Sequence, residues 1–359
     1  MKTEHLLIIR FSAMGDVAMT VPVVYSLAKQ YPNIRISVLS RPFAANFFDK
    51  LAPNVDFMSA DLNNEYKNLR GLNKLYRRLT AKRFTAIADF HDTLRSKYLR
   101  TRFSLDRFKV AHIDKHRADR RRLTAKGNKV LTPLQTSFQN YADVLAKLGY
   151  PIEIDFTSIF PRQDGTMPDL PNGIEAKNKE ERWIGIAPFA AHKGKVYPLE
   201  KMEKTIEMIQ TKYENTRIFL FGGRKEEKEQ LSLWAKKYER CVSVPTLLNT
   251  LQEELLLMYH LDVMISMDSA NMHLASLVNT PVISIWGATH PFAGFMGWNQ
   301  SADLAVQTDL TCRPCSIYGN KPCWRNDYAC LNEIKPEQII NKLDEVIYKN
   351  RKKINSFTY

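Results

Sequence analysis

The chain has 359 residues, 44% of them hydrophobic, and this length exceeds what one hydrophobic core usually organises, so two globular domains are expected. Charged residues interrupt every apolar stretch near the amino terminus before it reaches the length of a signal-peptide core, and no apolar run attains the roughly 18 residues of a membrane span. Five cysteines in a chain of this length do not suit a secreted disulfide scaffold. We therefore expect a soluble, cytoplasmic protein.

The formal net charge of +14 is unevenly distributed along the sequence. Residues 1–150 carry 27 Lys and Arg against 12 Asp and Glu, whereas residues 151–359 carry 25 against 26. The excess gathers in three runs, over 77–83, 95–102 and 115–122. Such a field attracts a polyanion, whether nucleic acid, an anionic membrane surface or a phosphorylated acceptor. A single basic run is more often only a solvated face.

The first predicted elements form a strand, loop, helix and strand, which is the building block of a doubly wound parallel sheet. A mostly apolar run over 6–11 is followed by a loop, Ser12–Asp16, and by a second β-branched run over 34–39. Pro22 either lies in the first turn of the intervening helix, with Thr20 as N-cap, or kinks a helix that begins earlier. Further along we predict strands over 84–90 and 108–113 and a helix over 137–148.

Residues 161–181 are rich in Pro, Gly, Asp, Asn and Lys, a composition typical of an interdomain linker. A second alternating series follows and predicts a second doubly wound domain. Its strands are expected over 183–187, 217–221, 241–244, 263–267 and 282–286, and its helices over about 199–212, 226–238, 251–261 and 272–278. A last helix is predicted over 335–349.

Ligands of open parallel sheets bind at the carboxyl ends of the strands, where loops lead into helix N-termini that favour anions. The first loop in such a position consists of Ser12, Ala13, Met14, Gly15 and Asp16. Gly15 permits close approach of a backbone, and Asp16 places a carboxylate at the mouth, although by position alone it is more often an N-cap. The loop lacks G-x-G-x-x-G, which disfavours a dinucleotide enzyme.

The second loop follows the apolar run over 263–267 and opens a helix. Its small residues leave backbone N–H groups accessible to a diphosphate, and its aspartate is able to bind sugar hydroxyls. Taken one at a time, however, such an aspartate is more often a helix N-cap and such a histidine is more often packed in the core. The residues are Asp268, Ser269, Ala270, Asn271, Met272 and His273. After the strand over 183–187, Lys193 and Lys195 are suited to neutralising a departing diphosphate, although most loop lysines are only solvated.

Three motifs occur in order along the chain: L-I-I-R-F-S-A-M-G-D-V-x-x-T-x-P, then K-x-Y-P, then D-S-A-N-M-H-L-A before P-V-I-S-I-W-G. This order resembles glycosyltransferase family 9, the heptosyltransferases of lipopolysaccharide core synthesis, from Leu6 to Cys330. The resemblance implies a GT-B fold, an α/β architecture of two Rossmann-like doubly wound domains facing across a cleft. An acceptor-binding domain over 1–165 would precede a donor-binding domain over 175–334, and a helix over 335–350 would cross back to the first domain.

The resemblance also implies roles for individual residues. Asp16 matches the aspartate that acts as general base. Lys195 matches a lysine that contacts the donor phosphates, and Lys193 lies beside it. Glu226 matches a carboxylate that binds the nucleotide ribose. The donor loop maps onto Asp268, Ser269, Ala270, Asn271, Met272 and His273, although the family commonly has glycine where this chain has Ala270. The implied reaction is an inverting single displacement from ADP-heptose or a related nucleotide sugar, without a metal or other cofactor.

The implied acceptor is a lipid-linked or lipopolysaccharide inner-core sugar that carries carboxylates and phosphates. We predict that basic side chains bind it and contact the anionic leaflet at the inner membrane. The candidates are Arg95, Arg120, Arg121 and Arg122. A monomer that does not bind nucleic acid is expected.

Four cysteines, spaced C-x₂-C-x₇-C-x₆-C, fall within one short segment: Cys312, Cys315, Cys323 and Cys330. Four thiolates are able to hold a structural zinc ion tetrahedrally. The spacing fits no well-known zinc pattern, and similar loops occur in the family without implying a metal. Reduced or partly paired thiols without a metal are therefore the favoured interpretation, and a structural zinc site is the alternative.

Two other classes of protein compete with a transferase. A nucleic-acid-binding protein would explain the basic half, but no reader motif is present and the acidic residues Asp89 and Asp92 interrupt the basic runs. A sugar-nucleotide epimerase or hydrolase would use the same scaffold, because a fold does not fix a function. A transferase should leave most donor intact until an acceptor is supplied.

Overall fold

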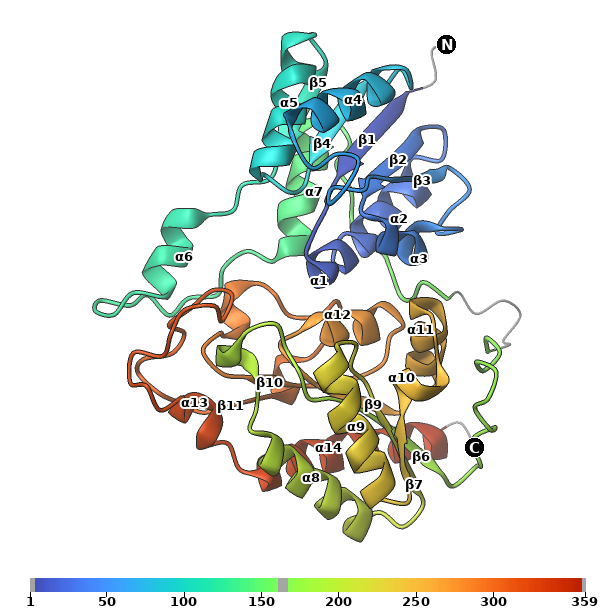
Figure 1. Cartoon of the computed structure of the whole chain (residues 1–359), viewed down its shortest axis with the longest axis vertical. Coiled ribbons are helices and arrows are strands. Elements are labelled where there is room, and N and C mark those ends of the chain that lie inside the picture. The colour runs from blue at the N-terminus through green and yellow to red at the C-terminus, as the bar shows by residue number, and fades with distance from the viewer. Residues whose placement is uncertain (1–3, 161–166, 357–359) are drawn as a thin grey trace. The chain divides into compact units, whose positions relative to one another are not determined.

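The structure, a computed structural model, describes residues 4–160 and 167–356 (Figure 1). The chain divides into two compact units, the first made of Met1–His116 and Gln135–Ile159 and the second of Arg117–Leu134 and Phe160–Tyr359. The sequence-based division at 165–175 placed 117–134 in the first domain, whereas its contacts assign it to the second unit. Residues 161–166 of the predicted linker lie outside the described residues.

The first unit is built on a five-stranded parallel sheet with the order β3-β2-β1-β4-β5. The strands are β1 (His5–Ile9), β2 (Arg35–Ser40), β3 (Val55–Ser59), β4 (Ala86–Asp89) and β5 (Lys109–His112). In the register of the central strand, Leu6 lies opposite Ile36 on one side and Ala86 on the other. Every residue of β1 is buried, as expected for a strand that is covered on both faces.

Helices cover both faces of this sheet. On one face α4 (Leu69–Thr80) and α5 (Leu94–Leu105) pack together on an apolar cluster, and on the other α2 (Val21–Gln30) packs with α7 (Ser137–Lys147). Pro22 occupies the second position of α2 behind Thr20 as N-cap, so the first of the two predicted alternatives is confirmed. The short helices α1 (Met14–Ala18) and α3 (Ala45–Phe48) complete the unit.

The second unit contains a six-stranded parallel sheet with the order β11-β10-β9-β6-β7-β8. The strands are β6 (Arg182–Ala187), β7 (Thr216–Leu220), β8 (Cys241–Ser243), β9 (Val263–Met267), β10 (Val282–Trp286) and β11 (Ala305–Gln307). Both sheets follow the doubly wound order in which the first strand lies at the centre, so the predicted fold class is confirmed.

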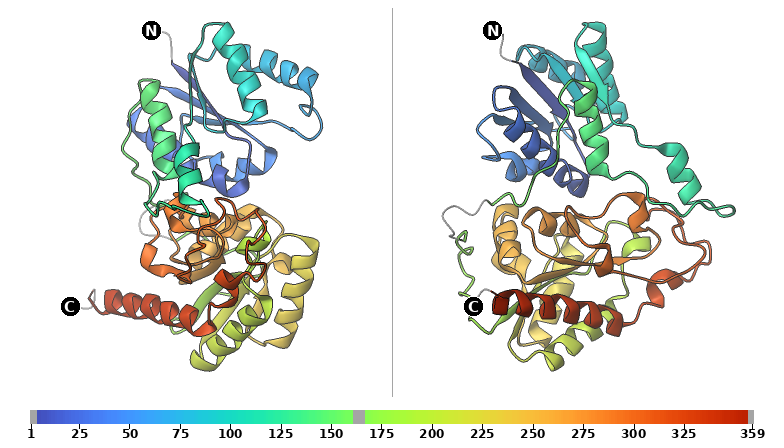
Figure 2. Two further views of the ribbon diagram at one scale, coloured as in Figure 1. Left: turned by 90° about the vertical axis from the view of Figure 1, so that its left-hand side faces the viewer. Right: turned by 180° about the vertical axis from the view of Figure 1, so that it is seen from behind.

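The helices of the second unit are α6 (Arg117–Leu123), α8 (Leu199–Lys212), α9 (Lys225–Lys237), α10 (Val244–Leu247), α11 (Leu251–His260), α12 (Ala270–Leu277), α13 (Ala329–Asn332) and α14 (Pro336–Ser356). Five of them, α8, α9, α11, α12 and α14, correspond to the predicted ranges, whereas α6, α10 and α13 were not predicted. The long helix α14, red in Figure 2, packs on α8, β10 and β11. Its return to the first unit stays a prediction. No helix in the described ranges has the length and apolarity that crossing a bilayer requires.

The segment 117–134 extends onto the second unit and carries part of the basic charge with it. Arg120 lies 5.1 Å from the centre of the Phe295 ring and donates a hydrogen bond of 2.8 Å to the Tyr318 hydroxyl. Lys129 donates to the carbonyl of Cys312 at 2.8 Å. The first unit therefore has 21 Lys and Arg against 13 Asp and Glu, and the second has 31 against 25. The positive excess is shared between the units.

Candidate active site

Each sheet has a topological switch point, where neighbouring strands lead into helices on opposite faces and a crevice forms at the carboxyl edge. In the first unit this point lies between β1 and β4, and in the second between β6 and β9. The loop with Asp16 follows β1, while Lys195 and Asp268 follow β6 and β9. The predicted residues thus lie where this fold binds ligands.

Asp16 lies in a short helix, because α1 begins at Met14 and the predicted loop is reduced to Ser12 and Ala13. One carboxylate oxygen accepts a hydrogen bond from the Ala13 N–H at 3.1 Å, which satisfies a donor at the helix start. The same oxygen lies 2.9 Å from Nη2 of Arg10. The side chain of Asp16 is 27% exposed. The carboxylate therefore has the local capping role that its position suggested, yet it stays within reach of a ligand.

Arg10 holds this carboxylate in place. The residue is buried, and its Nη1 donates a 2.7 Å hydrogen bond to the carbonyl of Phe90 at the end of β4. Its guanidinium carbon also lies 5.9 Å from the centre of the Tyr141 ring. Because these contacts fix the guanidinium on several sides, Arg10 presents its positive charge to Asp16 in one orientation. The sequence motif contained Arg10, but a role for it was not predicted because the pairing is visible only in three dimensions.

His91 lies beside the same loop. Its Nε2 is 3.4 Å from the Ser12 hydroxyl oxygen, and its Nδ1 is 3.3 Å from that of Thr93. Burial, reinforced by the charges of Arg10 and Lys115, lowers the pKa of His91 to about 3, so the ring is neutral at physiological pH. The sequence showed only that acidic residues interrupt the basic runs at this point, and it predicted no role for His91.

The acidic residues around His91 belong to the turn that carries it. Asp89 is fully buried and accepts hydrogen bonds from the backbone N–H groups of His91 and Asp92, at 2.9 and 3.0 Å. Arg100 lies 3.2 Å from the Asp89 carboxylate and 3.3 Å from that of Asp92. These carboxylates therefore order the loop after β4.

The second unit brings Lys195 and Asp268 together. The Lys195 ammonium lies 2.9 Å from the Asp268 carboxylate, and the two side chains are 17% and 5% exposed. Lys195 ends the 3₁₀ turn η2 (Lys193–Lys195), while Asp268 directly follows β9. The Asp268 N–H donates to the carbonyl of Ile285 at 3.1 Å, which anchors this residue to β10. Because the pair is nearly buried, its charges are screened less than those of a surface pair.

Three loops pack closely around Lys195 because each has a glycine at the point of contact: Gly194, Gly287 and Gly319. Gly319 has a φ of +73°, and a Cβ there would lie 2.4 Å from Cγ of Lys195. A Cβ on Gly287 would lie 2.6 Å from the carbonyl oxygen of Gly194. A side chain at either position would force the lysine loop to shift. The sequence did not reveal this packing, because no local pattern connects the three loops.

The predicted donor loop is mostly helical, because α12 begins at Ala270 with Ser269 as N-cap. Ser269 lies 3.3 Å from Ser266 between their hydroxyl oxygens, and no side chain caps the helix start. The first N–H groups of an α-helix have no partner inside the helix and favour an anion. Ala270 and Asn271 are half-buried, whereas Met272 and His273 are buried. His273 thus resembles the packed histidine of the alternative interpretation.

Two neighbouring glutamates at the start of α9 have different environments. Glu227 accepts hydrogen bonds from the N–H groups of Gly223 and Arg224 at 2.9 and 3.0 Å, so it caps the helix. Glu226 is exposed in the first helical turn, on the carboxyl side of β7. Among the candidates beside this site, Lys193 is also exposed, and its ammonium lies 5.0 Å from the centre of the Tyr328 ring.

The structure separates the predicted acceptor arginines. Arg95 is exposed in the first turn of α5, which follows β4 in the first unit. Arg120, Arg121 and Arg122 belong to α6 and are counted with the second unit. Arg120 is engaged with aromatic rings and Arg122 pairs with Asp119, whereas Arg121 is exposed. A single acceptor patch in one domain does not describe these four residues.

The four cysteines line one small cavity with Trp324 and Tyr328. Burial and the neighbouring thiols raise the pKa of Cys315, and burial raises that of Cys330 to about 12. Both buried sulfurs therefore favour the thiol form at neutral pH. Across the described residues, no three His, Cys, Asp or Glu side chains are grouped as metal ligands. Zinc binding by Cys312, Cys315, Cys323 and Cys330 stays the alternative to the predicted metal-free thiols, and neither interpretation is tested.

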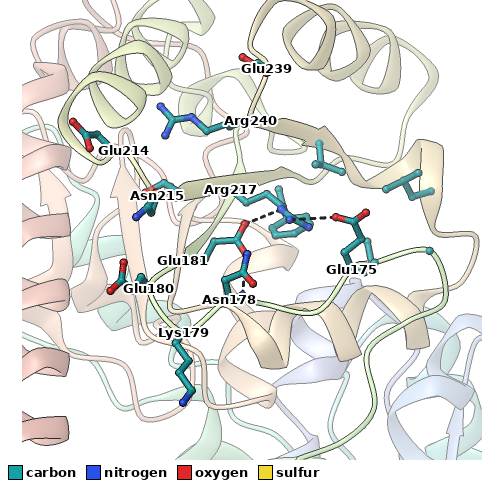
Figure 3. A pocket seen from close by; sticks show the side chains of 16 residues that line it. Glu175, Asn178, Lys179, Glu180, Glu181, Glu214, Asn215, Arg217, Glu239 and Arg240 are labelled. Carbon is teal, nitrogen blue, oxygen red and sulfur yellow. Dashed lines mark hydrogen bonds and ion pairs between the residues drawn. The ribbon is translucent and has the colours of Figure 1, made fainter.

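A separate pocket of about 800 Å³ lies at the amino ends of β6, β7 and β8, away from the edge that carries Lys195 (Figure 3). Figure 3 shows Arg217 between two carboxylates, 3.0 Å from Glu181 and 3.7 Å from Glu175. Its guanidinium carbon also lies 5.6 Å from the centre of the Trp183 ring. These contacts pair Arg217 with carboxylates of the pocket wall, and the lining contains none of the motif residues, so the size of the pocket does not make it the candidate site.

The model of glycosyltransferase family 9 (heptosyltransferase) matches residues 72–322, which is more than half of the chain. This protein belongs to glycosyltransferase family 9. It is therefore a glycosyltransferase, and the family and enzyme class predicted from its motifs are confirmed.

Several characterised members resemble this glycosyltransferase in sequence. Lipopolysaccharide heptosyltransferase 1 of Campylobacter coli is 22% identical over 350 residues, which are 94% of this chain and 98% of that protein. Lipopolysaccharide heptosyltransferase 3 of Escherichia coli is 26% identical over 77% of this chain and 81% of its own length. Lipooligosaccharide heptosyltransferase 2 of Campylobacter jejuni is 29% identical over 133 residues, so the match spans 40% of that relative.

Solved structures confirm the fold of the glycosyltransferase. The family 9 glycosyl transferase from Veillonella parvula has a TM-score of 0.70 at 17% identity, with 97% of this chain and 99% of that chain covered. The E. coli heptosyltransferase WaaC, solved with ADP, has a TM-score of 0.67 at 17% identity, with 95% and 99% covered. The predicted GT-B class, with two Rossmann-like domains, agrees with these neighbours.

Proposed function

We propose that this glycosyltransferase transfers heptose from ADP-heptose to an inner-core lipopolysaccharide or lipid-linked acceptor. The observation that carries the proposal is the buried Lys195–Asp268 pair beside the start of α12, at the switch point of the second unit. A cation beside a helix start that no side chain caps, at one sheet edge, is suited to a nucleoside diphosphate. The WaaC structures contain ADP or an ADP-heptose analogue, and this supports the same donor class here.

On the donor side, Lys195 and the first N–H groups of α12 stabilise the negative charge that grows on the diphosphate as it leaves. Because the lysine is already ordered by Asp268, little reorganisation accompanies the reaction. Exposed Glu226 binds the ribose hydroxyls, while Lys193 and the segment 269–273 shape the rest of the donor subsite. These donors supply the charge that other transferases obtain from a metal ion.

On the acceptor side, Asp16 acts as the general base. It removes the proton of the acceptor hydroxyl as that oxygen attacks the anomeric carbon, and the bond to the diphosphate breaks from the opposite face, which inverts the configuration. Arg10 keeps the carboxylate oriented through the contact of 2.9 Å. Ser12, Ala13, Met14 and Gly15 bring the backbone close to the acceptor, and the basic residues Arg95, Arg120, Arg121 and Arg122 contribute to binding its phosphates and carboxylates.

The proposed reaction takes place in the cytoplasm, where the protein, a monomer, contacts the anionic inner face of the membrane. A lipid-linked acceptor requires such contact, and the basic excess of both units favours it. No nucleic acid takes part in the proposed reaction.

The donor is identified by a thermal-shift screen with ADP-, GDP- and UDP-sugars, because a ligand that binds the native state raises the midpoint of unfolding. We expect the largest shift with ADP-heptose. Incubation of that donor without an acceptor distinguishes transfer from epimerisation or hydrolysis. Conversion of most of the donor under these conditions would contradict a transferase.

The role of Asp16 is tested with Asp16→Asn, which keeps the shape of the side chain and removes its basicity. We expect turnover to fall about 10²–10⁴-fold while the affinity for the donor persists. Asp49→Asn, at an exposed position of the same unit, is the matched control and should retain normal turnover. Near-normal turnover of a folded Asp16→Asn protein would refute the assignment of the base.

A further inference from the structure

The positive excess of the first unit lies in one continuous stretch. Residues 65–107 carry 12 Lys and Arg against 4 Asp and Glu, while the rest of the unit carries 9 against 9. This stretch comprises α4, β4, α5 and their connections. The two helices lie side by side on one face of the sheet (Figure 1, Figure 2). The net positive excess of the unit is therefore carried by α4, α5 and the segments that connect them.

The outer side of α4 is basic along its length. Arg70, Lys74 and Arg77 are exposed at positions i, i+4 and i+7, so they form one stripe, and Lys82 and Arg83 continue it beyond the helix. Lys74 pairs with Glu65 at 2.8 Å. Among the described residues, no carboxylate lies within 4.0 Å of the other four cations. The stripe therefore presents net positive charge to solvent.

Three large apolar side chains accompany this charge on the surface. Leu69 begins α4 and is 67% exposed, Leu94 begins α5 and is 88% exposed, and Leu105 ends α5 and is 72% exposed. Leu94 and Leu105 are eleven residues apart, about three helical turns, so they point to the same side of α5. Arg95 is exposed next to Leu94.

These leucines are not needed for the core of the unit. The inward sides of α4 and α5 supply Leu72, Leu75, Leu99 and Phe103 to the apolar cluster, and each of these residues is nearly or fully buried. The exposed leucines on the outer sides bury little apolar surface, so they gain little stability from folding. An exposed combination of basic and apolar side chains on helices is typical of elements that lie at a membrane interface.

We propose that the surface formed by Leu69, Arg70, Lys74, Arg77, Lys82, Arg83, Leu94, Arg95 and Leu105, the α4–α5 face, docks on an anionic lipid bilayer. The proposal deepens the proposed function, because it rests on a lipid-linked acceptor and names the surface that meets its membrane. The arginines and lysines attract acidic headgroups, and the leucines enter the boundary with the acyl chains. Nucleic acid would use the cations but offers no apolar phase for the leucines.

The test measures partition of the full chain onto vesicles of phosphatidylglycerol and phosphatidylcholine in equal parts, compared with phosphatidylcholine alone. We expect binding only to the anionic vesicles. The combined variant Arg70→Gln, Arg77→Gln and Lys82→Gln, called the α4 variant although Lys82 follows the helix, should lower partition roughly 5-fold per charge, or about a hundredfold in all. Leu94→Ser with Leu105→Ser should release the protein at a lower salt concentration than the unaltered chain, because electrostatic attraction alone is screened.

The matched control removes three cations from other parts of the same unit: Lys29→Gln, Lys50→Gln and Lys147→Gln. It changes net charge equally and should bind nearly as well as the unaltered protein. Equal loss of binding in both triple variants would overturn the proposal, because net charge and not the α4–α5 face would then govern binding. The proposal would also be overturned if the unaltered protein does not bind anionic vesicles. Tight binding of the unaltered protein to duplex DNA, lost in the α4 variant, would in that case identify nucleic acid as the ligand of this surface.

Failure of this proposal is distinguishable from failure of the proposed function. The α4 variant should transfer sugar to a delipidated, water-soluble acceptor at the normal rate, because none of its three positions lies in the donor or base site. If transfer is normal and vesicle binding is absent, the face is refuted and the function stands. If vesicle binding follows the α4–α5 face but no nucleotide sugar is transferred, the function is refuted and the docking surface stands.

Discussion

Replacing Lys195 by methionine keeps the unbranched stem of the side chain but removes the cation that lies 2.9 Å from Asp268. Asp268 is 5% exposed, so it would be left as a buried carboxylate without its ion-pair partner. Loss of one member of a buried pair costs about 3–5 kcal/mol, and the 17% exposure of Lys195 favours the lower end, about 3 kcal/mol. For a domain of about 200 residues, that loss lowers the unfolding midpoint by roughly 6–12 °C.

Tryptophan fluorescence measures this effect in the second unit alone, because Trp183, Trp234, Trp286, Trp298 and Trp324 all belong to it. The double variant Lys195→Met with Asp268→Asn removes the buried charge as well and should recover about 2 kcal/mol of the loss. It should not recover ADP binding, which calorimetry measures, because the cation proposed to bind the phosphates is still missing. The reasoning is refuted if Lys195→Met costs less than about 1 kcal/mol, or if the double variant is no more stable than the single one.

The pKa of His91 is about 3 in the folded chain against 6.5 unfolded, so stability is lost as pH falls below about 6.5. By about pH 5 the free energy of unfolding has fallen by about 2 kcal/mol. Urea unfolding of the His91→Gln variant should lack this part of the pH dependence. Equal pH dependence in the variant and the unaltered protein would contradict this reasoning. Gly319→Ala should cost at least about 1 kcal/mol and weaken ADP binding, because φ is +73° and the new Cβ meets Lys195, whereas Gly223→Ala, with open space around it, should be nearly neutral. Glu227→Ala should lower the free energy of unfolding by about 1 kcal/mol, because the cap and its two hydrogen bonds are lost. Glu226→Ala should leave stability unchanged and raise the Kd of ADP. The reverse pattern would assign the cap to Glu226 and the contact with the nucleotide to Glu227.

Most of the fold was predictable because buried parallel strands have nearly continuous apolar sequences. β9 and β10 were predicted with their observed bounds for this reason. β3 was missed because Val55–Ser59 mixes exposed and buried positions, and β11 because three residues give too short a pattern. The assignment of 117–134 to the second unit was unpredictable, since its contact between Arg120 and Tyr318 joins residues 198 positions apart.

The candidate site was predictable where a motif holds its residues within a few positions. Asp16, Lys195 and Asp268 were selected in this way, and the structure pairs the latter two across 73 positions of sequence. What the motifs did not contain is the environment of each charge. Burial makes Arg10 an anchor for Asp16 and makes His91 neutral, and both effects depend on the adjacency of β1 and β4.

The excursion of residues 117–134 means that the polypeptide passes between the two units three times, after His116, after Leu134 and after Ile159. A single cut in the linker therefore does not yield two complete pieces. In a hybrid that takes residues 1–159 from another family member, the foreign segment would have to match the native surface of Phe295, Tyr318 and Trp324. A hybrid that exchanges the first unit between relatives thus requires joint inheritance of residues 117–134 and of the loop over 312–324 that they contact.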